Sequence, residues 1–196
     1  MTTSALLLAA TVAAAAFASM WLPTQAMTVI PPPTTTVSGT CQAAHDADSR
    51  VNATFCTARL RKEPSAIDAD TRGLAKAAAA AGVRNADAAR SEVETALRRS
   101  DQGDEQENGP LYRGMLERCG MLYGIIRDKY AAAREAIAEQ RYGSVETDLS
   151  SVSWLGHSCS SGLVLARRAG VSPFVQYSED NTQIVLLTLA ITSLIK

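Results

Sequence analysis

The chain has 196 residues, with 19 Lys or Arg, 20 Asp or Glu and a formal net charge of −1 at pH 7. Proteins that bind nucleic acid need a clustered basic face, and no such cluster is visible in the sequence, so this class is excluded. Aromatic residues make up 5% of the chain while alanine is abundant, a composition that favours helices over sheets.

Residues 1–26 are predicted to be a secretion signal. No Asp, Glu, Lys or Arg occurs before Asp46, and the run from Ala5 to Leu22 is apolar or small. The small-x-small patterns Ala16-Phe17-Ala18 and Thr24-Gln25-Ala26 predict cleavage near residue 18 or 26. A membrane anchor is the alternative, because a run of about 18 residues is just long enough to span a bilayer. The basic residues that would orient an anchor are missing, so we expect a secreted protein with no membrane association after signal removal.

Residues 27–38 are predicted to be a linker, since they are rich in Pro and Thr and include Pro31-Pro32-Pro33. Such a stretch cannot build a core and prefers the extended polyproline II conformation. The folded domain is therefore expected at 39–196, which is the size of one ordinary domain.

Four cysteines follow the leader, at Cys41, Cys56, Cys119 and Cys159. An even number behind a secretion signal indicates two disulfides formed in an oxidising compartment. The layout predicts a small stapled hairpin, from Cys41 to about Leu60, followed by a cross-linked helical bundle. Three connectivities are open on sequence grounds.

Asn52-Ala53-Thr54, between the first two cysteines, is an N-glycosylation sequon. In a secreted chain, Asn52 is therefore a candidate glycosylation site.

Apolar residues at helical spacing predict four long helices after the hairpin. The first is expected over Ala66–Ser100, with Gly73 and Gly82 weakening it. The four stripes are Ile67, Leu74, Ala78, Ala81, Ala89, Val93, Leu97; then Leu111, Met115, Cys119, Leu122, Ile126, Tyr130, Ala133, Ile137; then Val145, Leu149, Val152, Leu155, Cys159, Leu163, Ala166, ending near Gly170; then Tyr177, Ile184, Leu187, Ile191, Leu194 after the start signal Ser172-Pro173.

Short breaks separate these helices, at 101–110, at Arg141–Ser144 and at 169–173. Long helices joined by short connections favour an up-and-down arrangement. We therefore predict an all-α fold, an antiparallel four-helix bundle with an N-terminal helical hairpin and two disulfides. Cys119 and Cys159 lie in the apolar stripes of consecutive helices, which supports pairing them with each other.

The residues that carry chemistry do not form a recognisable catalytic or metal site. A zinc site at His157 and Cys159 would need further ligands at suitable spacing, and His45 stands near acidic residues that are typical of a solvated helix. No nucleophile elbow or Gly-rich phosphate loop is present. We expect no enzymatic activity, no metal and no cofactor, and a protein that works by binding.

Several short segments in this order resemble the plant pectin methylesterase and invertase inhibitor family, and its pollen members in particular. They cover about 41–196 and are Gly39-Thr40-Cys41, Asn52, Phe55-Cys56, Leu60, Leu116-x-x-Cys119-x-x-x-Tyr123, Ala136-Ile137-Ala138, Tyr142-x-Ser144-Val145, Cys159, Gly170-Val171-Ser172-Pro173 and Leu187-x-Leu189-Ala190-Ile191-Thr192-x-Leu194.

The resemblance implies disulfides Cys41–Cys56 and Cys119–Cys159 in a four-helix bundle with a hairpin. It also implies a non-catalytic function, in which the protein forms a one-to-one complex with a cell-wall enzyme and covers its active-site cleft. The implied partner is pectin methylesterase or an acid invertase, of the cell wall or the vacuole, and the implied location is the apoplast.

One departure from the family favours the first partner. Some invertase inhibitors carry Pro-Lys-Phe between the second and third bundle helices, where this chain reads Arg141-Tyr142-Gly143-Ser144. Arg141 and Tyr142 are candidate partner contacts, since exposed tyrosines are enriched in binding hot spots, although Tyr142 is equally suited to packing at the bundle end. The leading hypothesis is inhibition of pectin methylesterase, the second is inhibition of invertase, and the third is a non-inhibitory helical pollen, structural or ligand-binding protein.

Overall fold

The computed structural model describes residues 36–101, 109–166, 172 and 174–195, and within these ranges the backbone forms helices and no strands. The helices are α1 (Val37–Ala47), α2 (Ala53–Leu60), the short 3-10 helix η1 (Pro64–Ala66), α3 (Thr71–Asp101), α4 (Pro110–Ala138), α5 (Tyr142–Leu149), α6 (Val152–Ala166) and α7 (Phe174–Ser193).

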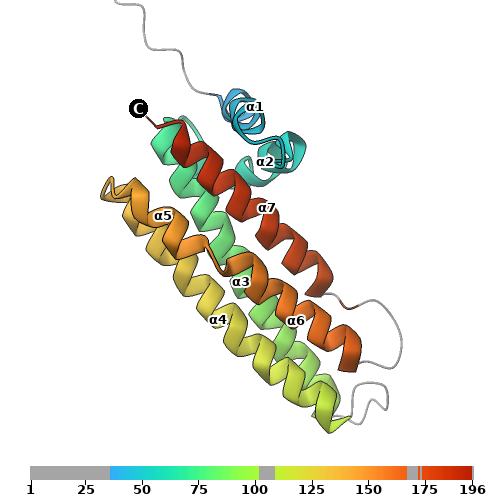
Figure 1. Ribbon diagram of the computed structural model, residues 1–196. Coiled ribbons are helices and arrows are strands. Elements are labelled where there is room, and N and C mark those ends of the chain that lie inside the picture. Colours follow the sequence, from blue (N-terminus) through green and yellow to red (C-terminus); the bar gives the residue numbers. More distant parts are fainter. Residues whose placement is uncertain (1–35, 102–108, 167–171, 173, 196) are drawn as a thin grey trace, which may run out of the picture. The chain divides into compact units, whose positions relative to one another are not determined.

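Four rods of helix lie side by side as a bundle (Figure 1). They are α3, α4, the consecutive pair α5 and α6, and α7, while α1 and α2 form a hairpin against α7 and α3. The predicted fold class, with its hairpin and two disulfides, is confirmed. The predicted signal at 1–26 and the linker residues up to 35 lie outside the described residues.

Both helices of the hairpin begin with a side-chain cap. Thr36 Oγ1 accepts a hydrogen bond from the Gly39 amide at 3.1 Å, and Asn52 Oδ1 accepts one from the Phe55 amide at 3.0 Å. These bonds satisfy amides that have no partner inside their helix. Because α1 begins at Val37, the helix takes up the last two residues of the predicted linker.

The two disulfides divide between the hairpin and the bundle. Cys41 of α1 is bonded to Cys56 of α2, and Cys119 of α4 is bonded to Cys159 of α6. All four cysteines are fully buried. This is the pairing that the family resemblance implies, and it ties α4 to the neighbouring rod.

The hairpin is held on the bundle by two ion pairs. Arg59 of α2 pairs with Asp180 of α7, and Glu63, just after α2, pairs with Arg84 of α3. The Glu63 side chain is almost completely buried, so this carboxylate depends on Arg84 for its compensation.

The first bundle helix begins later than the sequence predicts. Helix α3 starts at Thr71, not at Ala66, because Asp68 adopts a left-handed φ of 56° that no helix interior allows. Asp70 Oδ1 then accepts a hydrogen bond from the Gly73 amide at 2.7 Å at the start of α3. The prediction that Ile67 belongs to the buried stripe is wrong, since it lies outside the helix and is 73% exposed.

Helix α3 continues through Gly82, which the sequence predicts to weaken it, and the glycine has a packing role there. A Cβ atom at Gly82 would lie 2.3 Å from a ring carbon of Tyr130 in α4, which is too close for two non-bonded carbon atoms. The buried Tyr130 ring therefore uses the space that glycine leaves, and its hydroxyl donates to the Asn181 carbonyl at 3.0 Å.

The buried stripe of α4 is rotated at its N-terminal end relative to the prediction. Leu111, assigned to the core, is 67% exposed, whereas Tyr112, Leu116 and Tyr123 are buried. Helix α4 contacts α3 on one side and α5–α6 on the other, and the Tyr123 ring also lies 6.4 Å from the Phe174 ring of α7. Leu111 and Tyr112 are adjacent apolar residues, so helical spacing allowed either of them to be buried. Packing of α4 against several neighbouring helices decided that Tyr112 is the buried one.

The third predicted helix is two helices. Its backbone breaks between Leu149 and Val152, where Ser150 Oγ donates to the Thr147 carbonyl at 2.9 Å. The predicted stripe is nonetheless buried on both sides of the break, at Val145, Leu149, Val152, Leu155, Cys159 and Leu163. Its predicted end near Gly170 lies outside the described residues.

Helix α7 starts where the sequence predicts. Ser172 Oγ accepts a hydrogen bond from the Phe174 amide at 3.3 Å. Ile184, Leu187 and Ile191 of its predicted stripe are buried, while the two end positions of that stripe are half-buried.

Candidate partner-binding face

Helix α4 turns into α5 through a tight corner next to the predicted contact residues. Gln140 adopts a left-handed φ of 60°, and the Arg141 amide bonds to the Ala136 carbonyl at 2.8 Å. The corner is therefore at 139–141. The expected turn at Arg141–Ser144 is shifted, because Tyr142 already starts α5.

The corner separates Arg141 from Tyr142. Arg141 is exposed, and its guanidinium donates to Glu139 Oε2 at 2.7 Å and to Ser144 Oγ at 3.1 Å. Tyr142 is half-buried and packs against the core. Of the two predicted contacts, Tyr142 lines the groove described next and Arg141 does not.

This groove, here called the hairpin groove, has a volume of about 550 Å³ and runs between the hairpin, α5 and α7. Its floor is largely apolar. Its two charged side chains, Asp48 and Glu146, are both acidic. The lining residues are Ala47, Asp48, Tyr142, Gly143, Val145, Glu146, Leu189, Ala190, Thr192 and Ser193.

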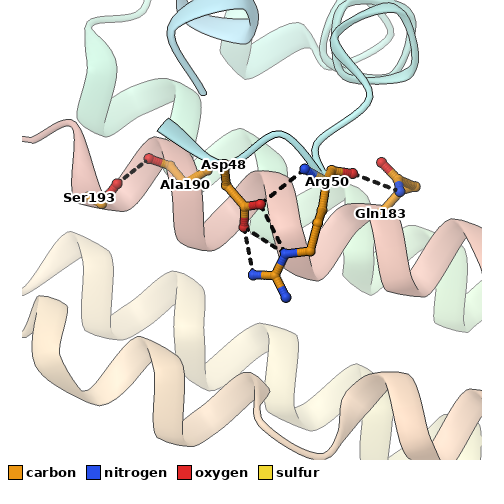
Figure 2. A network of polar contacts seen from close by, with 5 residues as sticks. All are labelled: Asp48, Arg50, Gln183, Ala190 and Ser193. Carbon is orange, nitrogen blue, oxygen red and sulfur yellow. Dashed lines mark hydrogen bonds and ion pairs between the residues drawn. The ribbon is translucent and has the colours of Figure 1, made fainter. Parts of the chain in front are cut away.

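A polar network fixes the hairpin wall of this groove (Figure 2). Asp48 accepts hydrogen bonds from the Arg50 amide at 3.0 Å, from its Nε at 2.9 Å and from its Nη2 at 2.7 Å. Hydrogen bonds from Arg50, mainly those of its side chain, lower the pKa of Asp48 to about 2. The charge of Arg50 is therefore already matched by a carboxylate of its own loop.

Gln183 of α7 attaches the same loop to the bundle (Figure 2). Its Nε2 donates to the Arg50 carbonyl at 3.3 Å, and its Oε1 accepts from the Asn52 amide at 3.0 Å. At the other end of the groove, Ser193 Oγ donates to the Ala190 carbonyl of its own helix at 2.7 Å.

A second groove, here called the tryptophan groove, lies between α6 and α7 and has a volume of about 390 Å³. Trp154, one of its walls, is 65% exposed. The lining residues are Ser153, Trp154, His157, Ser178, Glu179 and Thr182. Sequence reasoning missed Trp154, although a signal was present, because a large apolar residue stands directly beside the buried stripe position Leu155.

The two helices approach closely beneath the tryptophan groove. A Cβ atom at Gly156 would lie 3.2 Å from Asn181 Nδ2 and 3.5 Å from the Ser178 Cα, so a larger residue would need a shift of its neighbours. Within the groove, Thr182 Oγ1 donates to the Ser178 carbonyl at 3.2 Å.

Charge is divided unequally between the rods of the bundle. Helices α5, α6 and α7 contain no Lys or Arg, and they carry the four carboxylates of Glu146, Asp148, Glu179 and Asp180. Helix α3 has six Lys or Arg and four Asp or Glu, and α4 has five and three. We call the outward side of α5, α6 and α7 the α5–α7 face.

One of the four carboxylates on this face is paired with a basic residue from outside it, and a lysine of α4 reaches the backbone of a second acidic residue. Asp180 is paired with Arg59, and Lys129 Nζ lies 3.5 Å from the Asp148 carbonyl. Glu146 and Glu179 form no ion pair within the described ranges. Each of the two grooves thus combines one aromatic side chain with one such glutamate.

A groove between α3 and α4 provides the contrast. It has a volume of about 630 Å³ and carries both signs of charge, with Lys76 and Arg134 beside Asp128 and Glu135. Its cations are part of its own wall.

Sequence comparisons identify the family. Residues 35–191 match the family described as plant invertase/pectin methylesterase inhibitor. This chain belongs to that family. It is 33% identical over 156 residues to pectinesterase inhibitor 8 of Oryza sativa subsp. japonica, with 80% of this chain and 81% of the relative covered.

Two further relatives of this chain carry the names of both inhibitor types, one of pectinesterase and one of invertase. Pectinesterase inhibitor 12 of the same rice is 29% identical over 163 residues, covering 82% of this chain and 74% of the relative. A protein of Platanus acerifolia named "Putative invertase inhibitor" is 26% identical over 162 residues, covering 81% and 84%.

The remaining sequence candidates in this inhibitor have local structural contacts. His45 Nδ1 lies 2.8 Å from the Val51 carbonyl and closes the hairpin loop, and His157 Nε2 lies 3.2 Å from Ser161 Oγ. Asn52 is exposed and caps α2. Across the described ranges, no three His, Cys, Asp or Glu side chains are grouped to hold a metal ion. None of the described helices combines the length and apolar character that crossing a membrane requires.

Proposed function

We propose that this family member is a secreted inhibitor that binds pectin methylesterase one to one and covers its active-site cleft with the α5–α7 face. Family membership and the two pectinesterase inhibitors among its relatives support the proposal. The observation that carries it is the absence of Lys and Arg from α5, α6 and α7.

The charge of this face favours pectin methylesterase over invertase as the partner. Pectin methylesterase acts on a polymer whose released carboxylates are negative, so a cationic cleft suits its substrate and product. An acidic face without cations complements such a cleft and speeds the encounter. Sucrose is uncharged, and a cleft that binds it has no comparable need for an acidic inhibitor.

Tyr142 and Arg141 are proposed to take part in the contact. Tyr142 lines the hairpin groove, where its ring presents both an apolar surface and a hydroxyl. Arg141 is exposed at the corner just before it and is proposed as a contact at the rim of the interface.

Secretion to the apoplast belongs to the same proposal. The apolar leader at residues 1–26 and the two disulfides favour an oxidising compartment outside the cytosol. In that pathway the exposed Asn52 sequon is proposed to carry a glycan.

A paired enzyme assay tests the function. The full chain is expressed in plant cells, purified from the medium and titrated into a plant cell-wall pectin methylesterase and, in parallel, into an acid invertase. We expect pectin de-esterification to stop at one equivalent, with a one-to-one complex in light scattering, and sucrose hydrolysis to continue. Inhibition of sucrose hydrolysis alone would establish the invertase alternative, and no inhibition of either enzyme would leave a non-inhibitory role.

A further inference from the structure

We propose that the tryptophan groove receives one arginine side chain of the partner, with the guanidinium stacked on Trp154 and paired with Glu179. This inference rests on the proposed function, because it places the arginine in the cleft that the inhibitor is proposed to cover. It assigns a specific anchoring site within the α5–α7 face.

The first support is the exposure of Trp154. Most of this side chain is open to solvent although the neighbouring Leu155 is buried, so the indole forms a wall of the groove and not part of the core. Tryptophan offers the most favourable aromatic surface for a cation, and arginine is its most frequent partner. A planar guanidinium can stack on the ring and still direct its donors sideways.

The second support is the chemistry of the remaining wall. Glu179, Ser153 and Thr182 contribute a carboxylate and hydroxyl oxygens, all of which can accept hydrogen bonds. A guanidinium carries only donors, so this lining suits it. A purely apolar occupant would instead remove the Glu179 carboxylate from water without compensation, which is unfavourable.

The third support is the lack of a competing Lys or Arg in α5, α6 and α7. Arg59 and Arg50, which flank the face from the hairpin, are paired with Asp180 and Asp48. In the α3–α4 groove, by contrast, Lys76 and Arg134 line the same space as the carboxylates. The tryptophan groove thus places an aromatic ring beside a glutamate that forms no ion pair within the described ranges.

Single substitutions test the site. Trp154→Ala is expected to weaken inhibition of pectin methylesterase by about tenfold or more, the range of a binding hot spot. Glu179→Gln is expected to weaken it less and to flatten its dependence on salt, because a charge pair is lost. Two matched controls, Met121→Ala at an exposed apolar position of α4 and Glu135→Gln in the α3–α4 groove, are expected to leave inhibition within about twofold.

A spectroscopic readout reports on the groove directly. Apart from Trp21 in the leader, Trp154 is the only tryptophan of the chain. Inhibitor labelled with 5-fluorotryptophan is expected to show a shift of the Trp154 fluorine resonance on addition of unlabelled pectin methylesterase, and the shift is expected to shrink in Glu179→Gln. Circular dichroism spectra of the variants confirm that the bundle is retained.

The outcomes separate the two proposals. If the wild-type protein inhibits, but Trp154→Ala and Glu179→Gln behave like the controls and the resonance does not move, the arginine site is wrong and the inhibitor function stands. If the wild-type protein fails to bind pectin methylesterase at all, the proposed function and the site are both overturned.

Discussion

Helices α3 and α4 and helices α5 to α7 are built on different principles, although they share one core. Alanines and Gly82 bring α3 close to Tyr130 of α4, and the outer surface of this pair carries many charges of both signs. The α5–α7 face has few charged residues: its helices carry four Asp or Glu and no Lys or Arg. It also exposes Trp154 and Leu165.

The difference indicates that α3 and α4 serve as the scaffold of the bundle and that the α5–α7 face is its binding surface. Charges of both signs are typical of a solvated helix surface, while small residues let α3 and α4 pack closely. An acidic surface with exposed apolar anchors has the composition of a binding site, where aromatic residues are enriched and affinity is concentrated in a few side chains. Four predictions test this division, from the largest expected effect to the smallest.

Replacing Cys119 and Cys159 by alanine removes the covalent link between the two regions. The bond closes a loop of 40 residues, so chain entropy predicts a loss of about 4 kcal/mol in the free energy of unfolding. The same change at Cys41 and Cys56, which close a loop of 15 residues, should remove about 3 kcal/mol. Urea unfolding followed by far-ultraviolet circular dichroism measures both, and a larger loss for the hairpin pair would contradict this account.

Gly82→Val tests the seam between α3 and α4. The added methyl groups collide with the buried Tyr130 ring, so the free energy of unfolding should fall by about 1–3 kcal/mol. Gly114→Ala, on the outer surface of α4 where a Cβ meets no neighbour, is the matched control and should raise it by about 0.5–1 kcal/mol. Equal effects of the two changes in urea unfolding would mean that the seam is loosely packed.

Reversing charge on the two regions tests which of them meets the partner. Glu146→Lys combined with Glu179→Lys should weaken inhibition of pectin methylesterase by at least about tenfold, because like charges then face each other. Glu94→Lys with Glu135→Lys changes the net charge of the protein equally, but on α3 and α4, and should change inhibition by less than about twofold. A comparable loss for both double variants would show that only overall charge matters.

The smallest effect concerns the hairpin loop at the edge of the α5–α7 face. Hydrogen bonds from Arg50 lower the pKa of Asp48 from an ordinary value of 3.8 to about 2. A carboxyl whose pKa is lower in the folded state stabilises that state above about pH 4, and this contribution disappears as pH falls from about 4 to 2. Carbon-detected NMR titration should give a midpoint near 2 for Asp48, and Arg50→Ala should return it toward 3.8.

The helices were largely predictable because they depend on spacing within the chain. The stripe from Val145 to Leu163 is buried as its period indicates, and the apolar residues of α7 face the core. The spacing of apolar residues does not show on which sides of a helix its neighbours in the bundle lie. Leu111 and Tyr112 are both apolar, and only the positions of α3, α6 and α7 around α4 decided which of them is buried.

Local changes of backbone conformation could not be predicted from the apolar spacing either. The left-handed residues Asp68 and Gln140 set the start of α3 and the corner before α5, yet neither is a glycine. The break after Leu149 leaves the apolar period intact, so periodicity gave no sign of it.

The candidate site was predictable only in part. Tyr142 was identified because of the family resemblance, and it does line a groove. The tryptophan groove needs α6 and α7 side by side, a juxtaposition of residues more than twenty positions apart that a single sequence does not display. The charge difference between the rods, by contrast, was readable from the sequence once helix boundaries were assigned.

The break between α5 and α6 leads us to expect that the two grooves differ in how often they open. Helix α6 is bonded to α4 through Cys159, whereas α5 has eight residues and contains no cysteine. So short a helix depends entirely on its packing and opens locally more often than the core around it. Amide hydrogen exchange should therefore be faster in α5 than in α6. A partner would then meet the tryptophan groove already formed, and would complete the hairpin groove by holding α5 closed.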